Sequence, residues 1–469
     1  MSEVLDILEK AIDYSLKLGV DYVDVRFEKR IYERITVDNR VLREYSASED
    51  RGIGVRVIVD GYLGFAATTN TVWDSVREAI DKAVELAKSV RGSGRRVSLA
   101  SVKPVRDVRV SECKIDPFTI DPSEKVSFLL DLNRIALDVK DVKSAITSFG
   151  AVKVKKYFMS SENSHIELDI TMTGLRYISI AKWGDRLERV SDSQSKVAGY
   201  EFIKSVDWEK PVTEVSKLAV EVVKASTPPP GTYTVILDSD IVGLLLHEAF
   251  GHASEGDIVE SGASVLAGKL GEKVASELVT IVDEGVLADG SGVYHPYDDE
   301  GVAKGKTVIV EKGILKTYLT SRTTASRLGL ESTGNGRAQD YANIPLVRQT
   351  NLYMLPGDMK FEELLEDVDF GLYVTGKGAT GGEVNTGAGT FTFSVGVSRI
   401  IRKGELCEYV RGVTLSGAIL EVLKHVDGVS RELKVRTSVF GGCGKGGQSV
   451  YVGDGGPHIR VRRIVVGGR

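Results

Sequence analysis

Cysteine is scarce in this chain. Only three of its 469 residues are cysteine, Cys113, Cys407 and Cys443, and they lie far apart in the sequence. Small domains that depend on disulfides carry many more cysteines, so a disulfide framework is excluded. Such scarcity is typical of proteins in a reducing compartment, and we expect a cytoplasmic protein.

The chain also lacks long apolar runs. A membrane-spanning helix needs about 20 consecutive apolar residues, whereas the runs here are short, such as IVGLLL at 241–246. The first residues, MSEVLDILEKAID, mix apolar and charged side chains and contain no apolar core of the signal-peptide type. We therefore expect neither a membrane protein nor a secreted one.

No excess of positive charge is present either. The chain has 61 basic and 66 acidic residues, which give a net charge of -5. Nucleic acids and anionic membranes bind to positively charged surfaces, so neither is an expected partner. The composition, with 42% hydrophobic and 27% charged residues, is that of a globular protein. A chain of 469 residues exceeds one ordinary core, and we expect two domains.

The first half of the chain mixes helix and strand patterns. Apolar residues at helical spacing predict helices, and alternating apolar residues predict strands. The helices are expected at 4–18, 73–89, 123–139 and 212–225, and the strands within 22–68 and 151–182. In the second helix, Ser75 and Glu78 have the spacing of a capping box. The same helix carries one apolar stripe, formed by Val76, Ala79, Ile80, Ala83, Val84 and Ala87.

A proline run marks the expected domain boundary. The sequence STPPPG at 226–231 cannot continue the preceding helix and forms a stiff spacer. We divide the chain into an N-terminal α/β domain, residues 1–227, and a mainly β C-terminal domain, residues 232–469. The fold class is therefore α+β. After the spacer, TYTVILD predicts a strand, and Ser239 or Asp240 is the expected N-cap of the next helix.

That helix carries the sequence LLLHEAFGHASEGD at 244–257, in which His247, Glu248 and His252 interrupt an apolar segment. In an H-E-x-x-H zinc site the two histidines are four apart and share one helix face. His247 and His252 are five apart, which puts them about 140° apart on a regular α-helix. One inserted residue, a π-bulge, would bring them back into line, and Gly251 favours such a distortion. We predict a distorted helix at 247–252.

A structural alternative exists for these histidines, because single histidines on apolar helices are usually hydrogen-bonded core or surface residues. The glutamate directly after His247, and the nearby Glu255 and Asp257, favour metal binding instead. A hydrolytic zinc needs a third protein ligand. Cys443 is the best cysteine candidate, because glycines flank it in VFGGCGKGGQSVYVGDGGP. Its alternative role is that of a small buried thiol in a tight turn.

Two glycine-rich stretches match G-x-G-x-x-G, at 376–381 and 442–447. Neither predicts a dinucleotide site, because each leads into a strand-like segment and not into a helix. Asp298, Asp299 and Glu300 form an acidic triplet that could line an active site or form a second cation site. Acidic triplets in turns are usually solvated, which is the favoured interpretation, and we assign these residues no role.

Several motifs resemble those of the TldD/PmbA family of zinc metalloproteases: LLLHEAFGHASEGD, YDDEG at 297–301, TGNGR at 333–337 and CGKGGQSVYVGDGGP. Both histidines and the glutamate are kept, which is similar to the TldD side of the family. The resemblance implies a Zn²⁺ ion bound by His247, His252 and Cys443, with Glu248 as general base. It also implies a large curved antiparallel β-sheet in the C-terminal domain and a dimer that encloses a cavity. Arg348 and Asn351 in VRQTN resemble a family motif and are candidates for binding the backbone or carboxylate of a substrate; ordinary pairing at a strand edge is an equal alternative.

We therefore expect a zinc-dependent peptidase that acts on unfolded or short peptides. It would work as a homodimer or with a TldE/PmbA-like subunit. One alternative is a non-catalytic peptide-binding or assembly subunit with a structural zinc, closed by a fourth ligand such as Glu255 or Asp257. Another is a metal hydrolase of non-peptide amides.

Overall fold

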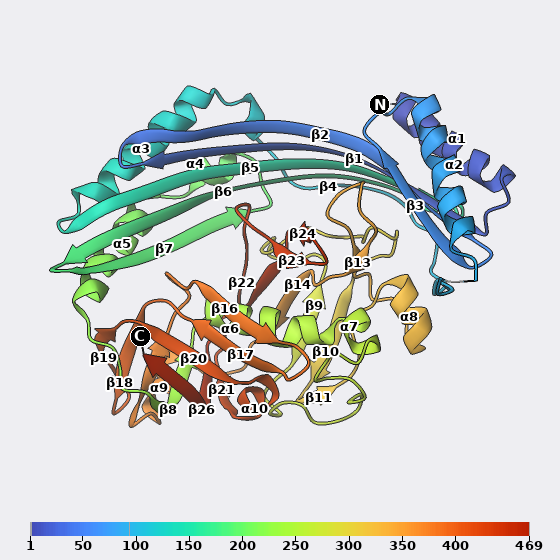
Figure 1. Cartoon of the computed structure of the whole chain (residues 1–469). Helices are drawn as coiled ribbons and strands as arrows, with labels where there is room; N and C mark the ends of the chain where they lie inside the picture. Colours follow the sequence, from blue (N-terminus) through green and yellow to red (C-terminus); the bar gives the residue numbers. More distant parts are fainter. Residues whose placement is uncertain (1, 93, 469) are drawn as a thin grey trace.

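The computed structural model describes residues 2–92 and 94–468, and its helices and strands confirm the α+β class (Figure 1). The first half contains helices α1 to α5, a 3-10 turn and strands β1 to β7. Their bounds are α1 Ser2–Lys17, β1 Tyr22–Asp38, β2 Val41–Val59, β3 Tyr62–Thr68, α2 Trp73–Ser89, β4 Arg106–Val110, η1 Pro117–Thr119, α3 Pro122–Asp138, β5 Val142–Ser160, β6 His165–Trp183, β7 Arg186–Lys196, α4 Glu201–Ser205 and α5 Glu209–Lys224.

These strands form one seven-stranded sheet in the order β3-β2-β1-β5-β6-β4, with β7 also paired to β6. The sheet is antiparallel apart from the pairing of β4 with β6. Its long central strands bow over the second half of the chain (Figure 1). Helices α1 and α2 pack at one end of these strands, and α3 and α5 at the other, each pair over its own hydrophobic cluster.

Helix α2 confirms its predicted apolar stripe, because all six residues of the stripe are buried. The prediction of a capping box at the start of this helix was wrong. The helix begins at Trp73, so Ser75 lies inside the first turn, and Val72 occupies the N-cap position without a side-chain hydrogen bond.

The second half contains strands β8 to β26 and helices α6 to α10. Their bounds are β8 Gly231–Leu237, α6 Ser239–Leu245, η2 Leu246–Gly251, η3 His252–Ser254, α7 Gly256–Glu260, β9 Ile281–Glu284, β10 Lys306–Glu311, β11 Ile314–Leu315, α8 Arg322–Leu328, β12 Gly336–Arg337, β13 Leu346–Val347, β14 Asn351–Met354, α9 Phe361–Glu366, β15 Phe370–Val374, β16 Gly381–Asn385, β17 Thr390–Ser394, β18 Ser398–Arg402, β19 Glu405–Val410, β20 Val413–Ala418, α10 Ile419–Lys424, β21 Val426–Val429, β22 Lys434–Thr437, β23 Cys443–Lys445, β24 Gln448–Val450, β25 Gly453–Gly456 and β26 Ile459–Gly468.

Two large sheets organise this half. One has nine strands, in the order β16-β17-β20-β26-β8-β15-β18-β19 with β21 beside β26, and the other has six, β11-β10-β9-β14-β25-β22. Each contains one parallel pair, β8 with β15 and β14 with β25, so both are mixed sheets. The bowed sheet with the longest strands lies in the first half of the chain (Figure 1). Helix α6 packs into a core shared by strands of both C-terminal sheets.

The acidic triplet joins the two halves of the chain, and its prediction as a solvated turn was wrong. Asp298, Asp299 and Glu300 are all buried. Glu300 accepts from Arg56 Nη1 at 2.6 Å, and Asp299 accepts from Lys156 Nζ at 2.9 Å. A buried carboxylate needs such a cation to offset its lost hydration.

The first glycine-rich stretch, residues 376–381, lies between β15 and the start of β16, as predicted. For the second stretch, residues 442–447, the prediction of a loop between strands was wrong in part, because it contains all of β23 and the turn after it. Residues 225–230 connect α5 to β8, and the two-domain division at this point remains a prediction. None of the described helices is long and apolar enough to cross a membrane.

Candidate metal centre

The two histidines lie on a helix that changes its winding. Asp238, one residue before the predicted cap positions, is the N-cap of α6 and accepts from Ile241 N at 2.9 Å. The α-helix then widens into a π-helical turn, η2, in which the backbone N–H of His252 donates to the carbonyl of His247. This five-residue hydrogen bond brings the two rings together, with centroids 5.2 Å apart. The predicted distortion at 247–252 is confirmed.

Gly251 and Gln349 explain why the wide turn forms here. A Cβ at Gly251 would lie 2.2 Å from Gln349 Oε1, so only glycine leaves room for this buried amide. Gln349 Nε2 donates to His247 O at 3.1 Å, on the carbonyl that also accepts from the N–H of His252. Gln349 thus supports the turn from outside the helix. No sequence pattern pointed to Gln349, although it stands between Arg348 and Asn351 in VRQTN.

Cys443 approaches the histidines from a short hairpin. Strands β23 and β24 are joined by Gly446 and Gly447, whose φ angles of 57° and 76° fit a two-residue turn with both central residues in the left-handed region. Arg348 donates to Cys443 O and, at 3.3 Å, to Gln448 O. The guanidinium therefore fixes the hairpin on both strands and sets the position of the thiol.

Arg348 and Asn351, the candidates for substrate binding, are both fully buried. Asn351 Nδ2 donates to Glu284 O and Val293 O, each at 2.9 Å, and its Oδ1 accepts from Val293 N at 2.7 Å. In this structure both side chains hold backbone groups in place of a ligand.

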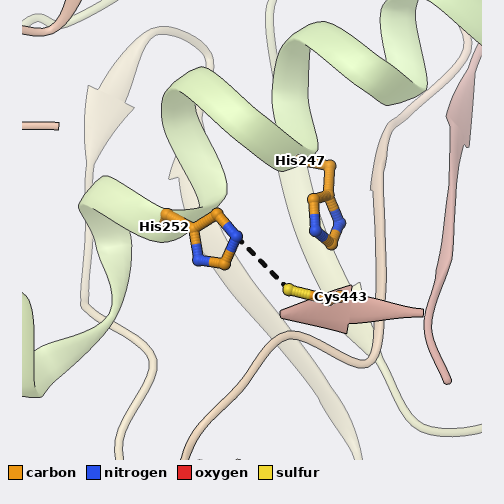
Figure 2. A group of neighbouring side chains, drawn as sticks. All are labelled: His247, His252 and Cys443. Carbon is orange, nitrogen blue, oxygen red and sulfur yellow. Dashed lines mark hydrogen bonds between the residues drawn. The ribbon is translucent and has the colours of Figure 1, made fainter. Parts of the chain in front are cut away.

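The structure brings His247, His252 and Cys443 together as expected (Figure 2). One possible ligand atom from each lies within 4.8 Å of the others, and Cys443 Sγ lies 3.3 Å from His252 Nε2. His247 and Cys443 are buried, and the Nδ1 atom of His247 has no hydrogen-bond partner among the described residues. Two imidazoles and one thiolate are a donor set that suits zinc, and it leaves one tetrahedral position open.

The electrostatics of the three side chains favour metal binding. Burial alone would raise the pKa of Cys443, but its hydrogen bonds to His247 and His252 lower that pKa to about 5. Burial lowers the pKa of His252, but Cys443 and Glu255 raise it to about 10. The metal-free group thus holds a thiolate beside a protonated imidazole, and a metal ion would replace the proton.

Glu255 orients His252 from the far side of its ring. Glu255 Oε2 lies 3.1 Å from His252 Nδ1, whereas the thiol faces Nε2. Lys445 Nζ donates to Glu255 Oε2 at 2.8 Å and to Asp257 Oδ1 at 2.7 Å. Both carboxylates are therefore engaged by Lys445, and Glu255 holds the ring of a ligand histidine as metal sites commonly require.

A cavity of about 440 Å³ opens beside the three side chains. Glu248 is half-buried in its wall, next to His247 and Cys443. The bowed sheet supplies Arg176 and Asp192 to the opposite wall. The cavity is also lined by Asp454, for which no sequence pattern predicted a role, and burial raises the pKa of Asp454 to about 6.

The chain matches known proteins over almost its whole length. Residues 230–468 match the PmbA/TldA metallopeptidase C-terminal domain, residues 23–87 match domain 1 and residues 115–226 match the central domain. A protein of Methanothermobacter thermautotrophicus named metalloprotease is 38% identical over 449 residues, covering 96% of each chain. A protein of Saccharolobus solfataricus named zinc metalloprotease TldD homolog is 31% identical over 472 residues, covering 98% of this chain and 99% of the relative.

The fold has a solved counterpart as well. The crystal structure of TldE from Thermococcus kodakarensis superimposes with a TM-score of 0.77 at 20% identity, covering 98% of this chain and 100% of that one. The domain matches and the identity to full-length relatives agree with the arrangement of the two histidines and the cysteine. The chain belongs to the PmbA/TldA metallopeptidase family.

Proposed function

We propose that this protein is a zinc-dependent peptidase that hydrolyses peptide bonds of unfolded or short peptides. The observation that carries the proposal is the position of Glu248. Its carboxylate lines the cavity beside the three-donor group and is half exposed to it. A general base must reach both water and substrate, and a half-exposed carboxylate at this place can do so.

His247, His252 and Cys443 would hold the zinc ion. When bound, zinc supplies Lewis acidity, which polarises a carbonyl and makes water a better nucleophile near neutral pH. Glu248 would take a proton from the attacking water and deliver it to the amine that leaves. Glu255 would keep the Nε2 atom of His252 directed at the metal through its 3.1 Å contact with Nδ1.

The cavity favours extended peptides as substrates. Its volume of about 440 Å³ accommodates a few residues of an extended chain but no folded domain. Both halves of the chain contribute to its walls, so a peptide would lie between the bowed sheet and the histidine helix. We further propose that the protein works in the cytoplasm as a dimer, either with itself or with a TldE-like subunit. The solved TldE has the same fold as this chain.

Metal content tests the site. We expect about one zinc per chain for the wild type and loss of zinc in Cys443→Ala, measured by mass spectrometry of protein purified without chelator. Cys407→Ala is the matched control, because Cys407 lies in β19 outside the metal-ligand group. Retention of zinc by Cys443→Ala would refute the proposed ligand set.

Peptide digestion tests the activity and separates it from a structural-zinc subunit. We expect Glu248→Gln to keep its zinc and to lose cleavage by about 10²-fold or more. Glu421→Gln, an exposed change on α10, should cleave like the wild type. If the wild type with zinc and a sister subunit cleaves nothing that Glu248→Gln does not cleave, the catalytic proposal fails and a binding subunit with structural zinc takes its place.

A further inference from the structure

A second cavity of about 310 Å³ adjoins the cavity of the metal centre. The two cavities share Phe440, Gly441 and Gly442, the three residues that precede the ligand Cys443. Strands β5 and β6 of the bowed sheet line the second cavity from the other side. A peptide held at the metal can therefore extend a side chain into it.

The part of the lining that a ligand can touch is mainly apolar and aromatic. Buried residues of β5 and β6, such as Val152 and Met172, form the back of the wall. The partly exposed apolar and aromatic side chains of the lining are Tyr32, Ile170, Val197, Tyr294, Phe440 and Tyr451. Covering such a surface with another apolar group is favourable.

The charged side chains of the lining already have partners inside the protein. The pairs are Arg30 with Glu28 and Gln339 O, Arg34 with Phe440 O, Lys156 with Asp299, and Arg337 with Gln349 O and Tyr451 O. These contacts hold the two halves of the chain together and leave the apolar surface to a ligand. Since the lining has four cations and one carboxylate, it disfavours a lysine or arginine side chain.

Phe440 is held in place, so the cavity is formed before a ligand arrives. A Cβ at Gly150 in β5 would lie 3.1 Å from Phe440 Cε1, so glycine at this position leaves room for the ring. Arg34 lies over the same ring, 5.6 Å from its centroid, and donates to Phe440 O at 3.2 Å. A preformed cavity loses little conformational entropy when a ligand binds.

Gly441 lies where the two cavities meet, and neither its backbone nor its packing requires glycine. Its φ angle is outside the left-handed region, and a Cβ there would meet no described atom within 4 Å. Gly442 differs, because a Cβ at that position would lie 2.3 Å from Val450 O. The missing side chain of Gly441 therefore leaves open the space through which a substrate side chain would pass.

We propose that the second cavity is a specificity pocket for an aromatic or large aliphatic side chain of the peptide substrate. The pocket lies at a fixed place relative to Cys443, so the preferred residue lies at a fixed distance from the bond that is cleaved. A small side chain would leave the wall uncovered, and a basic one would meet the four cations. The inference rests on the proposed peptidase function and adds a sequence preference to it.

Digestion of a defined peptide library tests the preference. The cleaved bonds would be identified by mass spectrometry for the wild type loaded with zinc. We expect phenylalanine, tyrosine, leucine and methionine to be enriched at one position relative to the cleaved bond, and lysine and arginine to be depleted there. In matched peptides, alanine at that position should lower kcat/KM at least about tenfold. Cleavage that depends on Glu248 but shows no such position would overturn the inference and leave the peptidase function intact.

Two variants place the preference in this cavity. Ile170→Trp fills the pocket, and Gly441→Leu narrows the space between the two cavities. Both should keep the zinc content of the wild type and reduce the phenylalanine-over-alanine preference to about twofold or less. Val108→Trp, on an exposed face of the same sheet, and Gly305→Leu, whose Cβ also meets nothing within 4 Å, are the matched controls. A preference that persists in both cavity variants would refute the assignment.

A binding measurement tests the pocket without activity. N-acetyl-4-fluorophenylalanine amide, an uncharged probe, would be titrated against the full chain and followed by fluorine NMR. We expect N-acetylleucine amide to displace the probe at a concentration at least about tenfold lower than N-acetylalanine amide does, and Ile170→Trp to weaken probe binding at least about tenfold. Equal displacement by the two amides, or probe binding unaffected by Ile170→Trp, would refute the pocket even if no peptide is cleaved.

Discussion

The contact between Gly251 and Gln349 leads to a quantitative prediction for Gly251→Ala. An added Cβ would lie 2.2 Å from Gln349 Oε1, far closer than van der Waals contact allows. The amide is the end of a flexible side chain, so the clash can be relieved by moving Gln349. That side chain is fully buried, however, and its movement breaks the 3.1 Å hydrogen bond to His247 O.

The expected loss combines two effects. A lost hydrogen bond costs about 0.5–1.5 kcal/mol, and overpacking of a dense interior costs about 1–3 kcal/mol. We expect the free energy of unfolding of the metal-free protein to fall by about 2–3 kcal/mol. Zinc affinity should fall by about 10-fold or more, because the π turn that aligns the two histidines is no longer supported.

Urea denaturation and zinc competition with a chelator measure these two quantities. Gly305→Ala is the matched control, because a Cβ at Gly305 meets nothing within 4 Å, and its effect should stay within about 0.5 kcal/mol. Gln349→Ala added to Gly251→Ala should cost less than the sum of the single changes, since the two residues are in contact. Full zinc affinity in Gly251→Ala, or strict additivity of the pair, would refute this account of the turn.

Three further predictions follow from the charges. Zinc affinity should rise with pH between about 6 and 9, by about tenfold per pH unit for each proton released. The reason is that the pKa of about 10 keeps His252 protonated in this range, whereas Cys443 is already a thiolate. Chelator competition at several pH values measures the affinity, and a flat profile would contradict the prediction. Arg56→Met leaves the buried carboxylates of Asp24 and Glu300 without their shared cation. It should lower the free energy of unfolding, measured by urea titration, by about 3–5 kcal/mol, and a loss below about 1 kcal/mol would contradict this. Burial raises the pKa of Asp299, but the larger effect of the nearby charges, Lys156 first, holds it below its ordinary value. The stabilisation from ionised Asp299 is therefore present above about pH 4 and is lost as the pH falls through the folded-state pKa. Asp299→Asn should reduce this loss of stability in acid.

The sequence predicted those parts of the site that depend on local spacing. The five-residue separation of the histidines, with Gly251 before the second, was enough to predict a π-type distortion. The glycines around Cys443 were enough to select it over the other cysteines. Both features have a local signal, because the spacing of the histidines and the glycines of the hairpin lie within the turns themselves.

The parts that could not be predicted depend on contacts between distant segments. Gln349 lies 102 residues from the carbonyl that it supports, and Arg56 lies 244 residues from Glu300. A single sequence contains no signal for such pairs, so the acidic triplet was interpreted as solvated when its cations come from the other half of the chain. Arg348 and Asn351 were selected because VRQTN resembles a family motif. Their hydrogen-bond partners are backbone groups of distant segments, and a single sequence does not show that these segments meet.

The two halves of the chain contribute different things to the proposed reaction. All three proposed metal ligands and Glu248 belong to the C-terminal half, whereas the bowed sheet lines the cavity beside them with Arg176 and Asp192. Changes of these lining residues, such as Arg176→Ala, should therefore alter which peptides are cleaved and leave the zinc content unchanged. Changes of the ligands His247 or His252 should remove zinc, whereas Glu248→Gln on the same helix should keep it. Because Arg176 is not a proposed metal ligand, its effect on peptide binding should add to that of a histidine change, and a strong coupling between the two changes would mean that the bowed sheet also sets the position of the metal ligands.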